Sequence, residues 1–115
     1  NINAAFYWYA KAACRGDSDA QDKLAWFYLT GRGAARNFEL ARKRYMTAAK
    51  HGNAGAVCNL GYMAERGLGA DVSRRRAASF YRRAARMGNR RAERCLKRLL
   101  DGTDFVKSTI QDVVD

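Results

Sequence analysis

The chain repeats itself with a period of 36 residues, and this repetition restricts its fold more than any other feature. Alanine is abundant in the chain, so matching alanines alone would carry little weight, but tyrosine, glycine and leucine recur in the same phase. Seven columns are identical in three copies: Ala5/Ala41/Ala77, Tyr9/Tyr45/Tyr81, Ala12/Ala48/Ala84, Ala13/Ala49/Ala85, Gly16/Gly52/Gly88, Ala20/Ala56/Ala92 and Leu24/Leu60/Leu96. The sequence is therefore an array of similar units.

Each unit is predicted to contain two helices. Residues 37–50 carry a stripe of apolar side chains at helical spacing, and a second stripe starts at Ala56. Polar residues that favour helix N-termini stand in fixed phase before the two stripes. They are Asn1, Asn37 and Ser73 before one helix, and Asp17, Asn53 and Asn89 before the other. Glycines follow the stripes and predict where the helices end, as Gly52, Gly67 and Gly69 do in the second unit.

Such helical hairpins cannot bury their apolar faces alone, so the units are expected to stack into an all-α solenoid. We expect repeats over residues 1–102, made of a half repeat (1–16), two full repeats (17–52 and 53–88) and a terminal half repeat (89–102). Residues 103–115, which contain Phe105, Ile110 and Val113, are expected to form a capping helix or a tail. The opening half repeat suggests that the chain belongs to a longer array.

The segment 56–69, read with Arg76-Ala77 and the segment 80–89, resembles the Sel-one-like repeat (SLR) family. The pattern of that family runs A-x-x-x-L-G-x-x-Y-x-x-G-x-G-V, then D-x-x-K-A, then W-Y-x-K-A-A-x-x-G. The likeness covers about residues 1–100, with departures at Ala25, Ala64, Asn37 and Ser73. It implies a right-handed superhelix, related to tetratricopeptide repeats, that serves as a scaffold for other proteins. The family shares no catalytic residues, so the resemblance implies no enzyme activity.

If the packing follows the family, Leu24, Ala25 and Tyr28 face inward, as do Leu60, Gly61 and Ala64 in the next unit. The other side of each first helix would then line a concave face. Gly55 would lie on that face, and the partner-binding candidates there are Asp19, Asp22, Trp26, Leu29, Cys58, Tyr62, Glu65, Arg91, Arg94 and Arg98. Trp26 and Tyr62 would be aromatic anchors, and the three arginines would pair with carboxylates of the partner. The alternative is that both aromatic rings pack between helices and touch no ligand.

Positive charge is concentrated near the C-terminal end of the array. The chain has a net charge of +11, and residues 74–98 contain eleven arginines and lysines against one acid. A candidate basic patch on the outer face consists of Arg74, Arg75, Arg82, Arg83, Arg86 and Arg90. It could bind an acidic protein, a nucleic acid or anionic lipid, or it could be a solvated surface of an arginine-rich chain. Nucleic acid is less favoured than protein, because no aromatic residues alternate with these arginines and no known reading module is present.

The sequence offers little for catalysis or for a cofactor. Its single histidine, His51, stands at a predicted helix end, where a cation suits the helix dipole. Three cysteines with no C-x-x-C spacing predict neither a disulfide framework nor a zinc site, although a Cys58–Cys95 bridge is conceivable. We therefore expect no metal and no cofactor. No apolar stretch is long enough to cross a membrane, and free thiols favour the cytoplasm over the periplasm.

Together these features predict a non-catalytic protein–protein interaction scaffold that holds a segment of its partner in the concave groove. The alternative function is binding of an anionic polymer, either nucleic acid or an acidic surface, through the arginine-rich region 74–98.

Overall fold

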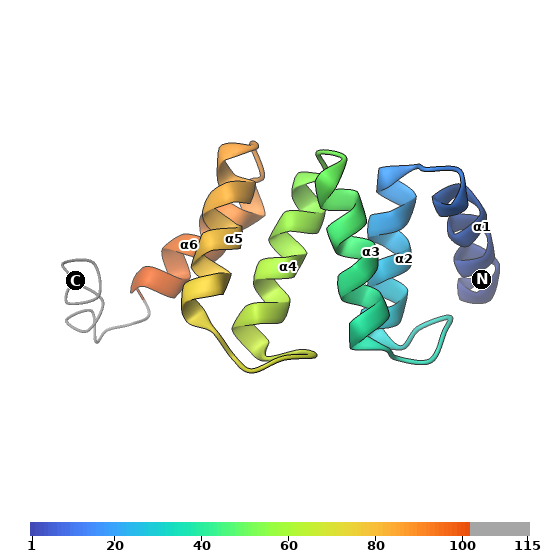
Figure 1. Cartoon of the computed structure of the whole chain (residues 1–115), viewed down its shortest axis with the longest axis horizontal. Coiled ribbons are helices and arrows are strands. Elements are labelled where there is room, and N and C mark those ends of the chain that lie inside the picture. The colour runs from blue at the N-terminus through green and yellow to red at the C-terminus, as the bar shows by residue number, and fades with distance from the viewer. Residues whose placement is uncertain (102–115) are drawn as a thin grey trace.

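Six helices of nearly equal length follow one another along residues 1–101. A computed structural model describes residues 1–101, which form α1 (Ile2–Cys14), α2 (Ser18–Thr30), α3 (Phe38–Lys50), α4 (Ala54–Arg66), α5 (Arg74–Arg86) and α6 (Arg90–Asp101). The helices stand side by side, from α1 at one end to α6 at the other (Figure 1). The predicted all-α repeat architecture is thereby confirmed. The predicted capping segment, 103–115, lies outside the described residues.

The residues that were predicted to cap the helices do so. The Asp17 carboxylate accepts hydrogen bonds from the Asp19 and Ala20 amides, at 2.9 and 3.0 Å. Asn1, Asn37, Asn53, Ser73 and Asn89 likewise accept from amides in the first turns of α1, α3, α4, α5 and α6. These bonds satisfy amides that have no partner within a helix, which explains why the polar residues recur in phase.

Glycines in the left-handed region end the first helix of each full repeat. Gly31 and Gly67 have φ angles of 74° and 70°, and their amides donate to the carbonyls of Phe27 and Met63. A residue with a Cβ adopts this conformation only at a cost, so the chain uses glycine here. The same turn therefore follows α2 and α4 and sends α3 and α5 back along them.

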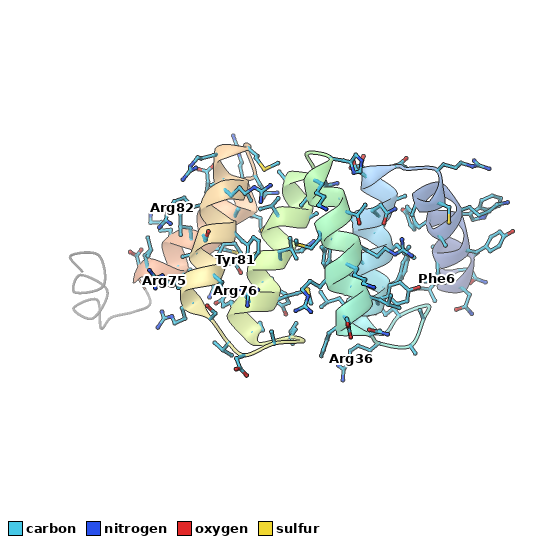
Figure 2. The ribbon with its side chains drawn as sticks, in the orientation of Figure 1. Phe6, Arg36, Arg75, Arg76, Tyr81 and Arg82 are labelled. Atoms are coloured by element: carbon cyan, nitrogen blue, oxygen red, sulfur yellow. The ribbon has the colours of Figure 1, made fainter. Side chains whose placement is uncertain are left out.

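A tyrosine packed against a small residue joins the helices of each pair. Tyr45 on α3 and Tyr81 on α5 are fully buried, and Ala25 and Gly61 occupy equivalent positions on α2 and α4. A Cβ added to Gly61 would lie 2.8 Å from the Tyr81 ring, so α4 and α5 touch at this point. Tyr81 points from α5 toward α4 (Figure 2). Tyr9 holds the equivalent place on α1 but is 37% exposed, because no described helix covers it in this way.

The buried side chains form one long core and a smaller one. The long core runs from α2 to α6 and contains Leu60, Met63, Ala64 and both buried tyrosines. The smaller core, Ala13, Ala20 and Leu24, holds α1 against α2. The buried Gln21 reinforces that contact, since its Nε2 donates to the Ala13 carbonyl at 2.8 Å. Each repeat thus depends on its neighbours for burial.

Candidate interaction groove

A hollow of about 640 Å³ lies where the first helices of successive repeats face one another. Its walls come from α1, α2, α4 and the start of α6. The lining residues are Tyr9, Asp22, Lys23, Trp26, Phe27, Gly55, Asn59, Asn89 and Arg91. Three aromatic rings and several polar side chains therefore surround a single open space, hereafter the groove, of the size that small ligands or peptide side chains occupy.

A chain of hydrogen bonds across three repeats forms the polar wall of the groove. Asn59 Nδ2 on α4 donates to Asp22 Oδ1 on α2 at 3.2 Å, and Arg91 Nη2 on α6 donates to Asn59 Oδ1. Burial raises the pKa of Asp22 above its ordinary value, and the bond from Asn59 opposes that change. The three side chains fix one another, so the wall is preorganised.

The two aromatic residues proposed as anchors are both accessible. Trp26 is 37% exposed and Tyr62 is 38% exposed. A guanidinium lies over each ring, that of Arg32 at 5.6 Å from Trp26 and that of Arg66 at 5.3 Å from Tyr62. These cation–π contacts hold the rings in place while leaving part of each surface open to solvent. Trp26 lines the groove, whereas Tyr62 is not among the lining residues.

Two of the three arginines predicted to meet a partner are bonded within the chain. Arg98 forms a bidentate ion pair with Glu65, with distances of 2.8 and 2.9 Å. Tyr81 also donates to Glu65 at 2.7 Å, and these bonds, first that of Arg98, lower the pKa of Glu65. Arg91 donates to Cys58 Sγ at 3.3 Å as well as to Asn59. Arg94 is exposed and makes no ion pair within residues 1–101.

The remaining candidates on the predicted concave face have varied environments. Cys58 is 1% exposed beneath Arg91, and burial raises the pKa of its thiol. Leu29 is half-buried against the long core. Asp19 is exposed at the start of α2 and accepts from Asn53 Nδ2 at 2.9 Å. Cys58 is therefore closed to a partner, while Asp19 remains open to one. All three cysteines are free thiols.

The groove thus brings together Asp22, Trp26 and Arg91 from the predicted partner-binding set, with Gly55 of the predicted concave face, and leaves the others outside its walls. It adds five residues that the sequence reasoning missed: Tyr9, Lys23, Phe27, Asn59 and Asn89. Lys23 and Asn59 stand one position after Asp22 and Cys58, so a broader helical face would have included them. Tyr9 lines the groove because it is uncovered, unlike its equivalents Tyr45 and Tyr81.

The candidate basic patch is exposed along α5 and at the start of α6. All six of its arginines are exposed, and Arg74 also donates to the Leu99 carbonyl at 3.1 Å. Arg75 and Arg82 lie on the side of α5 that faces away from α4 in Figure 2. His51 lies at the C-terminal end of α3, as predicted, with its Nδ1 2.9 Å from the Thr47 carbonyl oxygen.

Residues 1–101 contain neither a cluster of metal-ligating side chains nor a helix that could span a membrane. No three His, Cys, Asp or Glu side chains of this region gather in a way that could hold a metal ion. None of the six helices combines the length and the apolar character needed to cross a membrane.

Known proteins resemble this chain in both sequence and structure. The model of the Sel1 repeat family matches residues 1–17, 18–53 and 54–89. A solved Sel1 repeat protein from Oxalobacter formigenes matches with a TM-score of 0.72 and 36% identity, over 84% of this chain and 40% of that one. The protective antigen c5321 of uropathogenic Escherichia coli, which has an SLR fold, matches with a TM-score of 0.79 and 30% identity, over 89% of this chain and 22% of that one.

Among curated relatives, the component HRD3B of an ERAD-associated E3 ubiquitin-protein ligase from Arabidopsis thaliana is 36% identical over 74 residues. That alignment covers 64% of this chain and 12% of the relative. The chain spans less than a fifth of the length of the curated relatives that it matches.

Proposed function

The chain belongs to the Sel1 repeat family, and we propose that it acts as a non-catalytic scaffold that binds a segment of a partner protein in the groove. Sel1 repeat proteins are typically protein-interaction adaptors. The name of the Arabidopsis relative describes a component of a ligase assembly, which is a role of this kind. The match covers only 12% of that relative, so the partners of the relative are not assigned to this chain. The partner proposed here is one whose segment fits the groove.

The observation that carries the proposal is an accessible tryptophan in the wall of a preorganised hollow. Trp26 projects from α2 beside Asp22, and the bonded Asn59 and Arg91 complete the same wall. Tryptophan and arginine dominate the binding energy of many interfaces, because they bury a large surface and still offer polar contacts. The hollow is polar on one side and aromatic on the other, so it suits a peptide segment with both kinds of group.

The hydrogen bonds and the ion pair within the chain indicate which of the three predicted arginines is available to a partner. Arg94 is the member of the predicted arginine trio with no ion pair inside residues 1–101, so it is the one that can pair with a partner carboxylate at the lowest cost. Arg98 would first have to leave Glu65. We therefore assign Arg91 to the wall of the groove, Arg98 to its ion pair with Glu65, and Arg94 to contact with the partner outside the walls of the groove.

The proposal is tested by replacing one exposed tryptophan at a time. Proteins captured from the native lysate by the unmodified chain are identified, and their affinities are measured by calorimetry for the Trp26→Ala and Trp8→Ala variants. Trp8 is 64% exposed on α1 and does not line the groove, so it is the matched control. We expect Trp26→Ala to weaken the complex by about 2 kcal/mol and Trp8→Ala to leave it nearly unchanged. Equal affinity of Trp26→Ala and the unmodified chain would place the interface elsewhere.

The exposed arginines of α5 support one alternative, the binding of an anionic polymer through residues 74–98. Arg75, Arg82, Arg83 and Arg86 make no ion pair within the described chain, so their charge is available. The same capture experiment separates the two functions, because binding to phosphates releases counterions and falls steeply with salt. Material that is nuclease-sensitive, lost at high salt and indifferent to Trp26→Ala would favour the polymer.

A further inference from the structure

On the outer side of the array, a slot of about 280 Å³ opens between α3 and α5, with α4 as its floor. Met63 and Ala64 on α4, Leu68 in the following loop and Phe80 on α5 give it an apolar lining. Arg42 on α3 and Arg76 on α5 stand on its two sides. This feature, hereafter the outer slot, shares no residue with the groove.

The preceding repeat shows why the outer slot is open. Shifted by 36 residues, Ala64 corresponds to Tyr28 and Arg42 corresponds to Phe6. The Phe6 and Tyr28 rings pack edge to face, with centroids 5.8 Å apart, and so occupy the space between α1, α2 and α3. In the second repeat both rings are missing at the equivalent places.

The loop beside the outer slot makes the same backbone hydrogen bond as its equivalent in the preceding repeat. The Asn37 amide donates to the Tyr28 carbonyl at 2.8 Å, and the equivalent Ser73 amide donates to the Ala64 carbonyl at 2.9 Å. The loop that borders the slot therefore returns to the helix in the same way. The outer slot is open where the second repeat has alanine and arginine in place of the tyrosine and phenylalanine of the preceding repeat.

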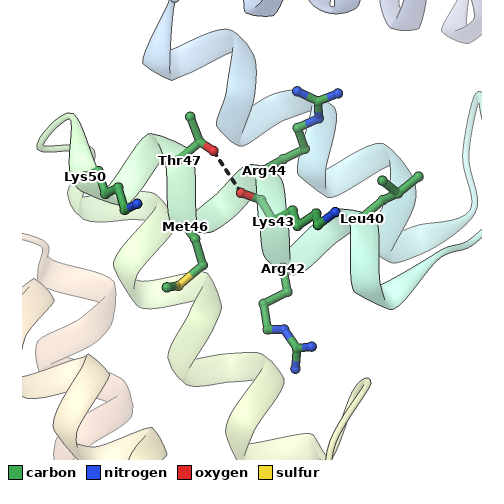
Figure 3. A pocket seen from close by; sticks show the side chains of 7 residues that line it. All are labelled: Leu40, Arg42, Lys43, Arg44, Met46, Thr47 and Lys50. Carbon is green, nitrogen blue, oxygen red and sulfur yellow. Dashed lines mark hydrogen bonds between the residues drawn. The ribbon is translucent and has the colours of Figure 1, made fainter.

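The surroundings of the outer slot are strongly positive. A second hollow, of about 460 Å³, continues along α3 and shares Arg42 and Met46 with the slot (Figure 3). The two hollows together are lined by five cationic side chains, Arg42, Lys43, Arg44, Lys50 and Arg76, and by no acidic one. Within residues 1–101 the ion pair of Arg98 with Glu65 is the sole salt bridge, so none of these five is neutralised there. An occupant with carboxylates beside an apolar group complements this surface.

We propose that the outer slot binds an acidic segment of a partner protein, with one aromatic side chain seated over Ala64 and flanking carboxylates paired with Arg42 and Arg76. A phenyl ring suits the apolar lining, because it places no polar atom there. A nucleobase would leave its N–H donors without side-chain acceptors in the slot, because Arg42 and Arg76 offer donors only, which disfavours nucleic acid. This site is independent of the groove and could be occupied together with it.

The probe is a short fluorescein-labelled peptide with a single phenylalanine flanked on both sides by aspartates, compared with the same peptide carrying alanine instead. Binding is followed by fluorescence anisotropy at physiological salt. We expect the phenylalanine peptide to bind the unmodified chain roughly tenfold more tightly than the alanine peptide. The variant Ala64→Tyr restores the side chain found at position 28 and should abolish that preference by filling the slot.

Arg76→Gln tests the contribution of the arginine charge at the slot, and Ala64→Met is a second way to fill the slot in case Ala64→Tyr does not fold. Arg76→Gln should weaken the phenylalanine peptide more than Arg82→Gln, which removes the same charge from α5 away from the slot. Ala64→Met fills the slot with a more flexible side chain and carries the same expectation as Ala64→Tyr, provided circular dichroism shows native helicity. Equal binding of the two peptides, or undiminished preference in both filled variants, would overturn the proposal. The proposal would also be overturned if an oligonucleotide or anionic vesicles displaced the labelled phenylalanine peptide as effectively as the unlabelled peptide does.

Discussion

At the scale of single residues, equivalent positions in two repeats have come to differ in their hydrogen bonding. Tyr45 and Tyr81 are both fully buried, and in both cases burial raises the pKa of the phenol. The Tyr81 hydroxyl donates to Glu65 at 2.7 Å, whereas the Tyr45 hydroxyl has no partner among the described residues. The position of Glu65 is held by Leu29 in the first repeat, which explains the difference.

Replacing each tyrosine by phenylalanine should therefore give different results. We expect Tyr81→Phe to lower the free energy of unfolding by about 1–2 kcal/mol, because a hydrogen bond to a charged acceptor is lost. Tyr45→Phe should be neutral or stabilising by up to about 1 kcal/mol, because it removes a buried donor that has no partner. Urea denaturation of the two variants and the unmodified chain measures both changes. A similar loss in both would mean that the Tyr45 hydroxyl is satisfied in solution.

The bonds of Arg91 and Arg98 within the chain could not be predicted from the sequence. The phase of the repeat placed Arg91, Arg94 and Arg98 together on the last helix. It could not tell which of them had partners, because those partners, Cys58, Asn59 and Glu65, lie more than 30 residues away in the sequence. Whether an arginine meets a carboxylate across a repeat boundary depends on distances between helices, and these follow from packing rather than from spacing along the chain.

At the scale of helices, α4 and α5 approach each other more closely than an alanine would allow. Gly61 faces the Tyr81 ring and also lies within 3.2 Å of Phe80 Cβ when a Cβ is added. Ala25 holds the equivalent position against Tyr45, so the first pair carries a Cβ where the second has none. The two pairs share their pattern but differ in the small residue that stands opposite the tyrosine.

The variant Gly61→Ala shows which of two opposing effects on stability is larger, the higher helix propensity of alanine or the overlap of its methyl group with Tyr81. Alanine in a helix is favoured over glycine by about 1 kcal/mol, so an exposed site would gain stability. Here the added methyl group would overlap the Tyr81 ring at 2.8 Å, and overpacking of this kind costs about 1–3 kcal/mol. We therefore expect a net loss in the free energy of unfolding, measured by thermal and urea denaturation. A more stable variant would show that α5 can move away from α4 at no cost.

Helices were the part of the fold that could be predicted most fully. Capping residues such as Asp17 and Asn53 mark where the helices start, and glycines such as Gly67 mark where they end. A short window of sequence is therefore sufficient to predict each helix. The groove could be predicted only in part. Trp26 was identified because it recurs in phase with Tyr62, but the volume and lining of the hollow depend on the angle between repeats. The outer slot was marked by Ala64, a departure from the repeat pattern whose consequence emerged only from the packing.

At the scale of the whole molecule, burial is distributed unevenly along the array. Seven residues of α4 are buried, whereas Ala13 is the one buried residue of α1. Tyr7 and Trp8 on α1 are 56% and 64% exposed. In a solenoid each helix is stabilised by its neighbours, so a helix at the end of the described array receives support from one side only.

Hydrogen exchange should reveal this gradient in stability. Local opening of α1 frees one buried residue, Ala13, and the partly buried Phe6, Ala10 and Ala12, whereas opening of α4 separates seven buried residues from α3 and α5. We expect the amides of α1 in the 115-residue chain to exchange at least about tenfold faster than those of α4, after correction for intrinsic rates. Mass spectrometry of peptic fragments measures the rates helix by helix. Uniform protection from α1 to α5 would instead mean that the repeats open together as one cooperative unit, and that nearest-neighbour packing does not limit the stability of the end.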